Sequence, residues 1–471
     1  MIRDFIHALG EIFEDLLSEW ETWFFLILFG LIPFFVIISS SSNQVLYRFI
    51  RFLELTWWFW IFWILFPFAR SLFLYWRQEL FKNSIEWMLL ELKVPRQIEK
   101  SSQAMEQVLD ALHSLRNSPG TIKEKYWDGE ITRWFSLEIV SFGGEIHFYI
   151  RAYKKLKRLI EVAFFSYYPD IDIIEVPDYI NELPSNISEL KEKGLDLFGT
   201  EMILSKEEAY PIKTYADFEN ETEEKNFDPL STFLEFLARL KKDEFAALQI
   251  LIAPADLKEW KEKWEPLVEK LRKATPLSIG ETKEAAPGFS FRSPGQTETL
   301  KAVEKNLSKP AFETLIRVLF IAPEENFDTA YARKNLMGSF NQYTALNLNS
   351  FKANADITPL ATMWKKPYLF AKKRIMYRKE RLLLNYKKRE MPPPLNIAKL
   401  WTSSFFYSNF SSKTFKMSTE CLATLFHLPT AILMTEPFIR HLESRRVGPP
   451  AGLNIFGEEE EIKKFYQPHH G

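Results

Sequence analysis

The chain has 471 residues and a formal net charge of −2, so its overall charge points neither to nucleic acid nor to acidic partners. This length predicts roughly three domains of about 150 residues each. The single cysteine, Cys421, excludes an intramolecular disulfide framework and fits a reducing compartment. Because Cys421 lies in an apolar helical pattern, we interpret it as a small buried hydrophobic side chain.

Residues 1–21 predict an amphipathic helix, because their apolar residues recur at helical spacing. The remaining positions are rich in Asp and Glu, which is not the basic start of a cleaved signal peptide. An acidic face also disfavours binding to an anionic membrane surface. Contact with another protein chain explains this helix at least as well as contact with a membrane does.

Residues 22–77 predict two transmembrane helices. The stretch 22–39 carries no charge, and the stretch 55–76 carries only Arg70. Both approach the ~20 residues that cross a ~30 Å hydrocarbon core. Two spans place both termini on one side, and the Lys and Arg residues that follow favour the cytoplasm for the body. The sequence therefore predicts a two-span protein of the cytoplasmic (inner) membrane, with the lipid bilayer as a partner and a cytoplasmic body.

Residues 85–178 predict a βαββαβ unit. Its expected elements are a strand at 87–95, a helix at 101–117, two strands flanking Gly143 and Gly144, a helix at 154–169 and a strand at 170–176. The adjacent glycines between two alternating stretches indicate a hairpin. A βαββαβ unit folds as a four-stranded antiparallel sheet with two helices on one face, the ferredoxin-like arrangement.

Residues 200–360 repeat the same order of elements. These are a strand region at 201–215, a helix at 228–242, strands at 245–254 and 312–323, a helix at 325–343 and a strand at 346–351. A mostly helical insertion, 255–309, separates the two central strands. Those strands end in "LIAP" and "FIAP", which favours a duplication.

Residues 361–400 form a basic segment rich in aromatic residues. Within residues 365–390, eleven Lys or Arg accompany only two acidic residues. Such a segment can bind DNA phosphates, lie on an anionic membrane surface, or form a solvated helical flank of the sheet; all three alternatives stay open. The candidate nucleic-acid or membrane-surface residues are Lys365, Lys366, Lys372, Lys373, Arg374, Arg378, Lys379, Arg381, Lys387, Lys388 and Arg389.

The fold class predicted by these features is α+β. It consists of an N-terminal transmembrane helical hairpin, two ferredoxin-like (βαββαβ) repeats and a basic helical C-terminal segment. Residues 401–471 are expected to add a C-terminal helix and a linker-like tail.

Enzyme signatures are absent from the sequence. A phosphate-binding loop requires G-x-x-x-x-G-K-[ST], and the closest stretch, "GLDLFGTE" at 194–201, has Thr200 in the lysine position. The seven histidines do not show metal-ligand spacing, and one cysteine disfavours a structural zinc site. We therefore expect a protein that is not an enzyme, with no catalytic, cofactor-binding or metal-binding residues.

Several stretches together resemble the N-terminal, non-motor region of type IV secretion or conjugation coupling ATPases, a domain of unknown function. These membrane-anchored proteins are common in candidate-phylum bacteria. The stretches are "VPRQIEKSSQAMEQVLDALHSL", "FSLEIVSFGGEIHFYIRAYKKLKRLIEVAFFSYYPDIDIIEV", "EAYPIKTYADFE", "DPLSTFLEFLARLKKDEFAALQILIAP" and "CLATLFHLPT…RRVGPPAGL". The resemblance covers roughly residues 20–455, and "PDIDIIEV" and "YPIKTY" are its most specific parts.

In that family a hexameric P-loop motor follows a segment similar to "RRVGPPAGL". In this sequence "NIFGEEEEIKKFYQPHHG" follows Leu453, so no catalytic residue of the family can be carried over. The resemblance implies a non-enzymatic, membrane-anchored component of a DNA or protein transfer apparatus, which serves as a platform for a separately encoded P-loop motor. The candidate docking residues are Arg445, Arg446, Pro449 and Pro450.

Two further expectations concern partners. The alternative function is a membrane-tethered DNA-binding protein that uses residues 365–389. A homo-oligomer is also expected, since motors of the resembled class are rings.

Overall fold

The computed structural model describes residues 43–93, 102–219, 228–273, 294–360, 371–392 and 412–429. Its strands are β1 (Trp87–Lys93), β2 (Phe135–Phe142), β3 (Glu145–Tyr153), β4 (Asp172–Val176), β5 (Leu195–Leu204), β6 (Phe245–Pro254), β7 (Ala311–Pro323), β8 (Phe351–Ala353) and β9 (Phe415–Ser418). In these described ranges they form one nine-stranded antiparallel sheet in the order β4-β1-β3-β2-β6-β7-β5-β8, with β9 paired to β7.

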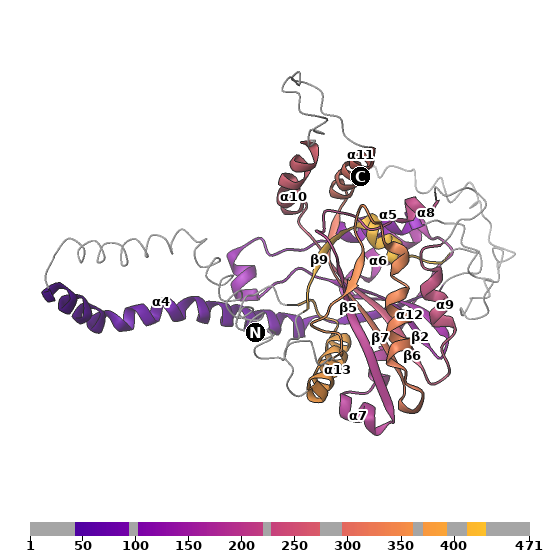
Figure 1. Cartoon of the computed structure of the whole chain (residues 1–471), viewed down its shortest axis with the longest axis horizontal. Helices are drawn as coiled ribbons and strands as arrows, with labels where there is room; N and C mark the ends of the chain where they lie inside the picture. Colours follow the sequence, from indigo (N-terminus) through magenta and orange to yellow (C-terminus); the bar gives the residue numbers. More distant parts are fainter. Residues whose placement is uncertain are drawn as a thin grey trace, which may run out of the picture.

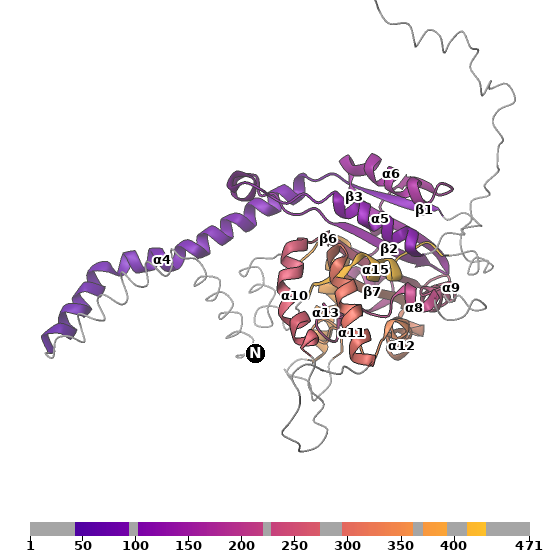
Figure 2. The same ribbon diagram turned by 90° about the horizontal axis from the view of Figure 1, so that it is seen from above.

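Helices cover both faces of this sheet. The helices of the described residues are α4 (Asn43–Ser84), which does not lie on the sheet, α5 (Ser102–Ser114), α6 (Lys157–Tyr167), α7 (Ile187–Glu192), α8 (Tyr215–Glu219), α9 (Ser231–Ala238), α10 (Leu257–Arg272), α11 (Pro294–Ser308), α12 (Thr329–Gly338), α13 (Ala371–Lys388) and α15 (Thr419–Leu425). Helices α5, α6, α9, α12 and α15 share one apolar core with the strands, and α7 and α13 share another core on the opposite face. Helix α4 extends away from the sheet, and its end contacts the π-helix η2 (Lys123–Asp128) (Figures 1 and 2).

The sheet consists of two halves with the same strand order. In the first half the order is β4-β1-β3-β2, and in the second half it is β8-β5-β7-β6. The halves meet through β2 and β6, which pair from Phe135↔Ile252 to Phe142↔Phe245. Helices α10 and α11 are inserted between β6 and β7 of the second half. Because the sheet continues through the junction, residues of both halves pack into each of the two cores.

The predicted fold class is wrong in its membrane hairpin and in its separate repeats. The first predicted span, 22–39, lies outside the described residues, and the second, 55–76, falls within α4. In the described part of the chain no helix is both long and apolar enough to cross a membrane. The strands, moreover, belong to one sheet instead of two. The two-span inner-membrane location, which rested on this hairpin, is wrong as well.

The composition and contacts of α4 explain this error. Residues 55–76 hold five tryptophans, whose polar N–H group suits an interface better than a hydrocarbon core. In addition, the Arg70 Nη2 atom donates to the Tyr126 hydroxyl at 2.7 Å, and Arg77 donates to the Trp127 carbonyl group. The last turns of α4 therefore pack against η2 of the same chain. The predicted domain boundaries stay predictions.

Gly199 in β5 lets α13 lie close to the sheet. A Cβ atom there would come within 2.5 Å of the Val318 carbonyl oxygen and 2.7 Å of Leu382 Cδ2 on α13. We expect Gly199→Ala to lower the free energy of unfolding by about 1–3 kcal/mol, because the backbone of β7 cannot yield as a side chain can. Urea denaturation measures the change.

The matched control is Gly338→Ala in α12, where an added Cβ atom would meet nothing within 4 Å. That substitution should be neutral or stabilising by up to about 1 kcal/mol, since alanine favours the helix. Equal effects at the two positions would contradict the close packing of α13 on β5.

Candidate functional site

Four polar side chains form a row across the centre of the sheet, on the face that α13 covers. Glu138 (β2) pairs with Gln249 (β6), Gln249 pairs with Arg317 (β7), and Arg317 pairs with Glu201 (β5) in the register of the strands. None of the four residues is more than 2% exposed. A buried ion costs several kcal/mol unless it is paired and hydrogen-bonded. The chemistry that these four side chains can carry out therefore depends on their ion-pair and hydrogen-bond partners.

Glu138 receives hydrogen bonds at both carboxylate oxygens. Arg389 donates from Nε to Oε1 (2.6 Å) and from Nη2 to Oε2 (2.7 Å), which is a bidentate pair. The Tyr179 hydroxyl donates to Oε2 (2.6 Å), and Gln249 Nε2 donates to Oε1 (3.1 Å). Burial acts to raise the pKa of Glu138, but the Arg389 guanidinium and these bonds hold it below its usual value. Glu138 is therefore an ionised and fully engaged carboxylate.

Arg389 fixes the C-terminal end of α13. Its φ is 53°, the one positive φ of a non-glycine residue in the described part of the chain. A left-handed backbone costs about 1–2 kcal/mol for such a residue. The Arg389 side chain also donates to Asp178 Oδ2 (2.6 Å), and its carbonyl oxygen accepts from Trp134 Nε1 (2.7 Å). These contacts hold the strained residue against the first half of the sheet.

Arg317 and Glu201 form a second buried pair, in the second half. Arg317 Nε donates to Glu201 Oε1 (2.9 Å), and its Nη1 donates to Gln249 Oε1 (3.2 Å) and to the Asn385 carbonyl oxygen (3.1 Å). Ser412 also donates to Glu201 Oε1 (3.0 Å), whereas Oε2 has no hydrogen-bond partner among the described residues. Burial raises the pKa of Glu201 above its usual value, and Arg317 offsets this only in part. This pair is less well satisfied than Glu138 and Arg389.

Part of the predicted basic segment is used inside the fold. Arg378 is buried and donates to three backbone carbonyl groups. Lys379 pairs with Asp196 of β5 at 2.5 Å, and Lys387 donates to two backbone carbonyl groups. Together with Arg389, these cations bind groups of this same chain.

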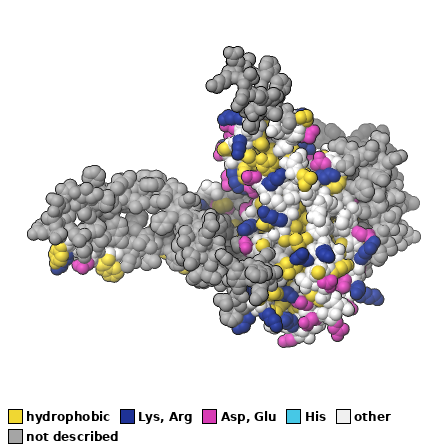
Figure 3. Space-filling view, in the orientation of Figure 1, with side chains coloured by type: hydrophobic (Ala, Val, Ile, Leu, Met, Phe, Trp, Pro, Cys, Tyr) yellow, Lys and Arg dark blue, Asp and Glu magenta, His cyan; other side chains and the backbone are white. Residues whose placement is uncertain are grey.

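The remaining predicted site residues on α13 differ in exposure, and their role at a surface stays a prediction. Lys372, Lys373 and Lys388 are exposed, and Arg374 and Arg381 are half-buried. Blue Lys and Arg side chains alternate with magenta Asp and Glu side chains on the face seen in Figure 3. The other predicted residues, which lie outside the described part of the chain, are Lys365, Lys366, Arg445, Arg446, Pro449 and Pro450.

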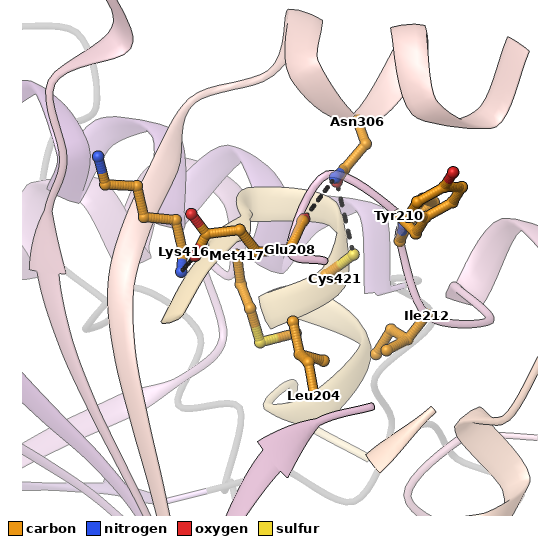
Figure 4. A pocket seen from close by; sticks show the side chains of 9 residues that line it. Leu204, Glu208, Tyr210, Ile212, Asn306, Lys416, Met417 and Cys421 are labelled. Atoms are coloured by element: carbon orange, nitrogen blue, oxygen red, sulfur yellow. Dashed lines mark hydrogen bonds between the residues drawn. The ribbon is translucent and has the colours of Figure 1, made fainter. Parts of the chain in front are cut away.

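A small pocket lies beside Cys421 on the opposite face of the sheet (Figure 4). The Cys421 thiol donates to Asn306 Oδ1 at 3.8 Å, and the Lys416 backbone N–H donates to Glu208 Oε2 at 2.6 Å. The space is that of about one water molecule. Burial raises the pKa of the Cys421 thiol to about 11, so it stays protonated at neutral pH. This position fits a packed side chain and not a nucleophile.

The polar row was not predicted from the sequence, although a signal for it exists there. Glu138, Gln249 and Arg317 each lie between two apolar residues in the middle of a strand: Leu137 and Ile139, Leu248 and Ile250, and Ile316 and Val318. A single polar residue at the centre of three buried strands indicates partners in the core. The strand pattern alone does not show that these strands are neighbours.

Comparison with known proteins assigns the chain to a family. A protein-family model described as "Domain of unknown function (DUF8128)" matches residues 76–438, and the expected domain of unknown function is thereby confirmed. No curated protein matches the chain.

Proposed function

We propose that this chain, which belongs to the DUF8128 family, is a non-enzymatic component of a type IV secretion or conjugation-like transfer apparatus. It would serve as a platform for a separately encoded P-loop motor. Support comes from the resemblance of stretches such as "PDIDIIEV" and "YPIKTY" to the non-motor region of coupling ATPases. In that region the segment similar to "RRVGPPAGL" leads to the motor.

One structural observation carries the platform part of this proposal. Helix α13 joins the two halves of the sheet through buried charges: Arg389 binds Glu138 of the first half, and the Asn385 carbonyl oxygen accepts from Arg317 of the second half. Such a clamp keeps the halves in a constant relative position. Its charged groups are engaged with each other, whereas catalytic groups must reach a substrate. A stiff support fits this arrangement better than an active site does.

The alternative, DNA binding through residues 365–389, receives less support. Arg378, Lys379, Lys387 and Arg389 are held by groups of the fold, so they are not free to neutralise phosphates. Each lost phosphate contact reduces the salt dependence of DNA binding by about one unit of slope. We retain DNA binding as an outcome of the test below.

We expect a neighbouring gene to encode a P-loop ATPase that binds the full chain, and the deletion of residues 430–453 to weaken this binding at least tenfold. The deletion begins at 430 because Phe426 and Leu428 are buried in the core. Deletion of residues 454–471, which leaves "RRVGPPAGL" in place, is the matched control and should keep wild-type affinity. Biolayer interferometry with the purified ATPase measures each dissociation constant.

A second experiment tests the alternative of DNA binding. Lys372, Lys373 and Lys388 are exposed, so their joint replacement by Gln should leave ATPase binding unchanged. Wild-type DNA binding that falls steeply with salt, with a slope reduced by about three in this variant, would support the alternative function. ATPase binding that survives the 430–453 deletion, or that is absent in the wild type, would contradict the platform.

A further inference from the structure

Strand β4 is an edge strand of the sheet. It pairs with β1 along one side, and no strand of the described residues pairs with its other side. The backbone N–H and C=O groups of such an edge can pair with a further strand. Ile173 and Ile174, which point to opposite faces of β4, are only half-buried. A strand added at this edge would cover them.

Helix α6 leads into β4 and carries an uncovered apolar stripe. It buries Ile160 and Phe164 in the core. Leu159, Val162 and Phe165, spaced three residues apart, are 50%, 64% and 44% exposed. Neighbouring exposed side chains of this size are typical of an interaction surface. The uppermost position of α6 in Figure 2 shows that its outer side is at the boundary of the described body.

The charges along α6 and β4 follow an order. Helix α6 and strand β4 run in opposite directions, since Lys157 at the start of α6 binds Glu175 near the end of β4 at 2.8 Å. Exposed Lys155 and Arg158 therefore lie at one end of the unit. Asp170 and Asp172 lie at the other end, where α6 finishes and β4 begins. The surface has an excess of basic side chains at the first end, where Glu175 is paired with Lys157, apolar side chains in the middle beside half-buried Glu161, and acidic side chains at the other end.

This arrangement of charges matches that of a second copy rotated about a twofold axis. We propose that β4 and α6 form a symmetric interface between two copies of this chain, with the two β4 strands antiparallel about a twofold axis. The basic end of each copy then meets the acidic end of the other, and the apolar stripes lie between them. A surface that matches its own rotated copy is what a twofold dimer requires. The two sheets would join as β2 and β6 join the halves within one chain.

Sedimentation equilibrium of the full chain tests the interface. We expect a dimer whose dissociation constant rises at least tenfold in the variant Val162→Glu/Phe165→Glu. Thermal unfolding of this variant monitored at low concentration should stay close to wild type, because both side chains are exposed. Leu346→Glu, at a position that is 94% exposed and distant in the sequence, is the matched control and should keep the wild-type constant.

A charge exchange tests the antiparallel arrangement. Lys155→Glu/Arg158→Glu and Asp170→Lys/Asp172→Lys should each weaken self-association at least tenfold, because like charges then face each other. An equimolar mixture of the two variants should regain a dimer that contains one copy of each. A wild-type chain that is monomeric at every concentration, or a mixture that fails to associate, would overturn the proposal.

Discussion

Replacing Arg389 by methionine should lower the free energy of unfolding by about 3–5 kcal/mol, the usual cost of leaving one member of a buried ion pair without its partner. Glu138 would lose its two bonds to the guanidinium, at 2.6 and 2.7 Å, while remaining fully buried. Urea denaturation followed by circular dichroism measures this change. The neighbouring Lys388→Met is the matched control, because Lys388 is exposed, and should change stability by at most about 0.5 kcal/mol.

A double substitution separates the pair from other effects of the mutation. In Glu138→Gln/Arg389→Met the uncompensated charge is gone, so the double variant should be more stable than the sum of the single losses predicts, by about 1–3 kcal/mol. The Tyr179 and Gln249 bonds remain available to a glutamine at position 138. Additive losses would contradict an energetic coupling between Glu138 and Arg389.

Arg317→Met should produce a loss that depends on pH. At pH 7 we expect a loss of about 3–5 kcal/mol, because Glu201 is buried and keeps only the hydroxyl of Ser412 as a donor. Burial already raises the pKa of Glu201 above the ordinary value, and removal of Arg317 raises it further. The unfolded chain then releases the Glu201 proton at lower pH than the folded chain does, so stability is retained below the unfolded pKa and falls as pH rises. The slope approaches about 1.4 kcal/mol per pH unit.

Stability curves of this variant measured between pH 4 and pH 8 test the sign. In Arg317→Met/Glu201→Gln the added pH dependence should vanish, since no carboxylate remains to titrate. Arg239→Met, which removes an exposed pair with Glu235 in a neighbouring turn, is a control that should cost at most about 0.5 kcal/mol at any pH. A pH profile of Arg317→Met that parallels the wild type would contradict this account.

The apolar stretches of the sequence predict the central strands closely. β6 has the predicted bounds, 245–254, and β7 starts only one residue before its predicted range. Gly143 and Gly144 have φ values of 58° and 94°, as a tight hairpin turn between β2 and β3 requires. The start of β5 was misplaced, since it begins at Leu195, six residues before the predicted strand, directly after the left-handed Gly194. The bounds of a strand and the position of a tight turn depend on residues close together in the sequence, so a local pattern can predict them.

The order of the strands in the sheet could not be predicted from such local patterns. Alternation tells which residues form a strand but not which strand lies beside it, so the pairing of β2 with β6 was not foreseen. One indication was present: all ten residues of β6 are buried, and its sequence is almost wholly apolar, which is typical of a strand covered on both faces. An edge strand would have shown polar residues at alternate positions.

The number of charged residues in the basic segment did not predict which of them are buried. The number of Lys and Arg residues predicted a surface, but Arg378 and Arg389 are buried, and their partners are backbone carbonyl groups and the carboxylates of Glu138 and Asp178. The two carboxylates lie more than 200 residues from Arg389, so no local pattern relates them to α13. The candidate docking residues Arg445 and Arg446, together with the proposed platform function, stay predictions.

The pair of Glu138 and Arg389 also sets an order of events during synthesis. The two residues are 251 positions apart, so the ribosome adds Arg389 roughly 10–50 s after Glu138 at bacterial and eukaryotic elongation rates. Throughout that interval the Glu138 carboxylate of β2 has no Arg389 to pair with, and α13 is made only in its last part. The face of the first half that carries Glu138 is therefore completed only when α13 and Arg389 have been synthesised.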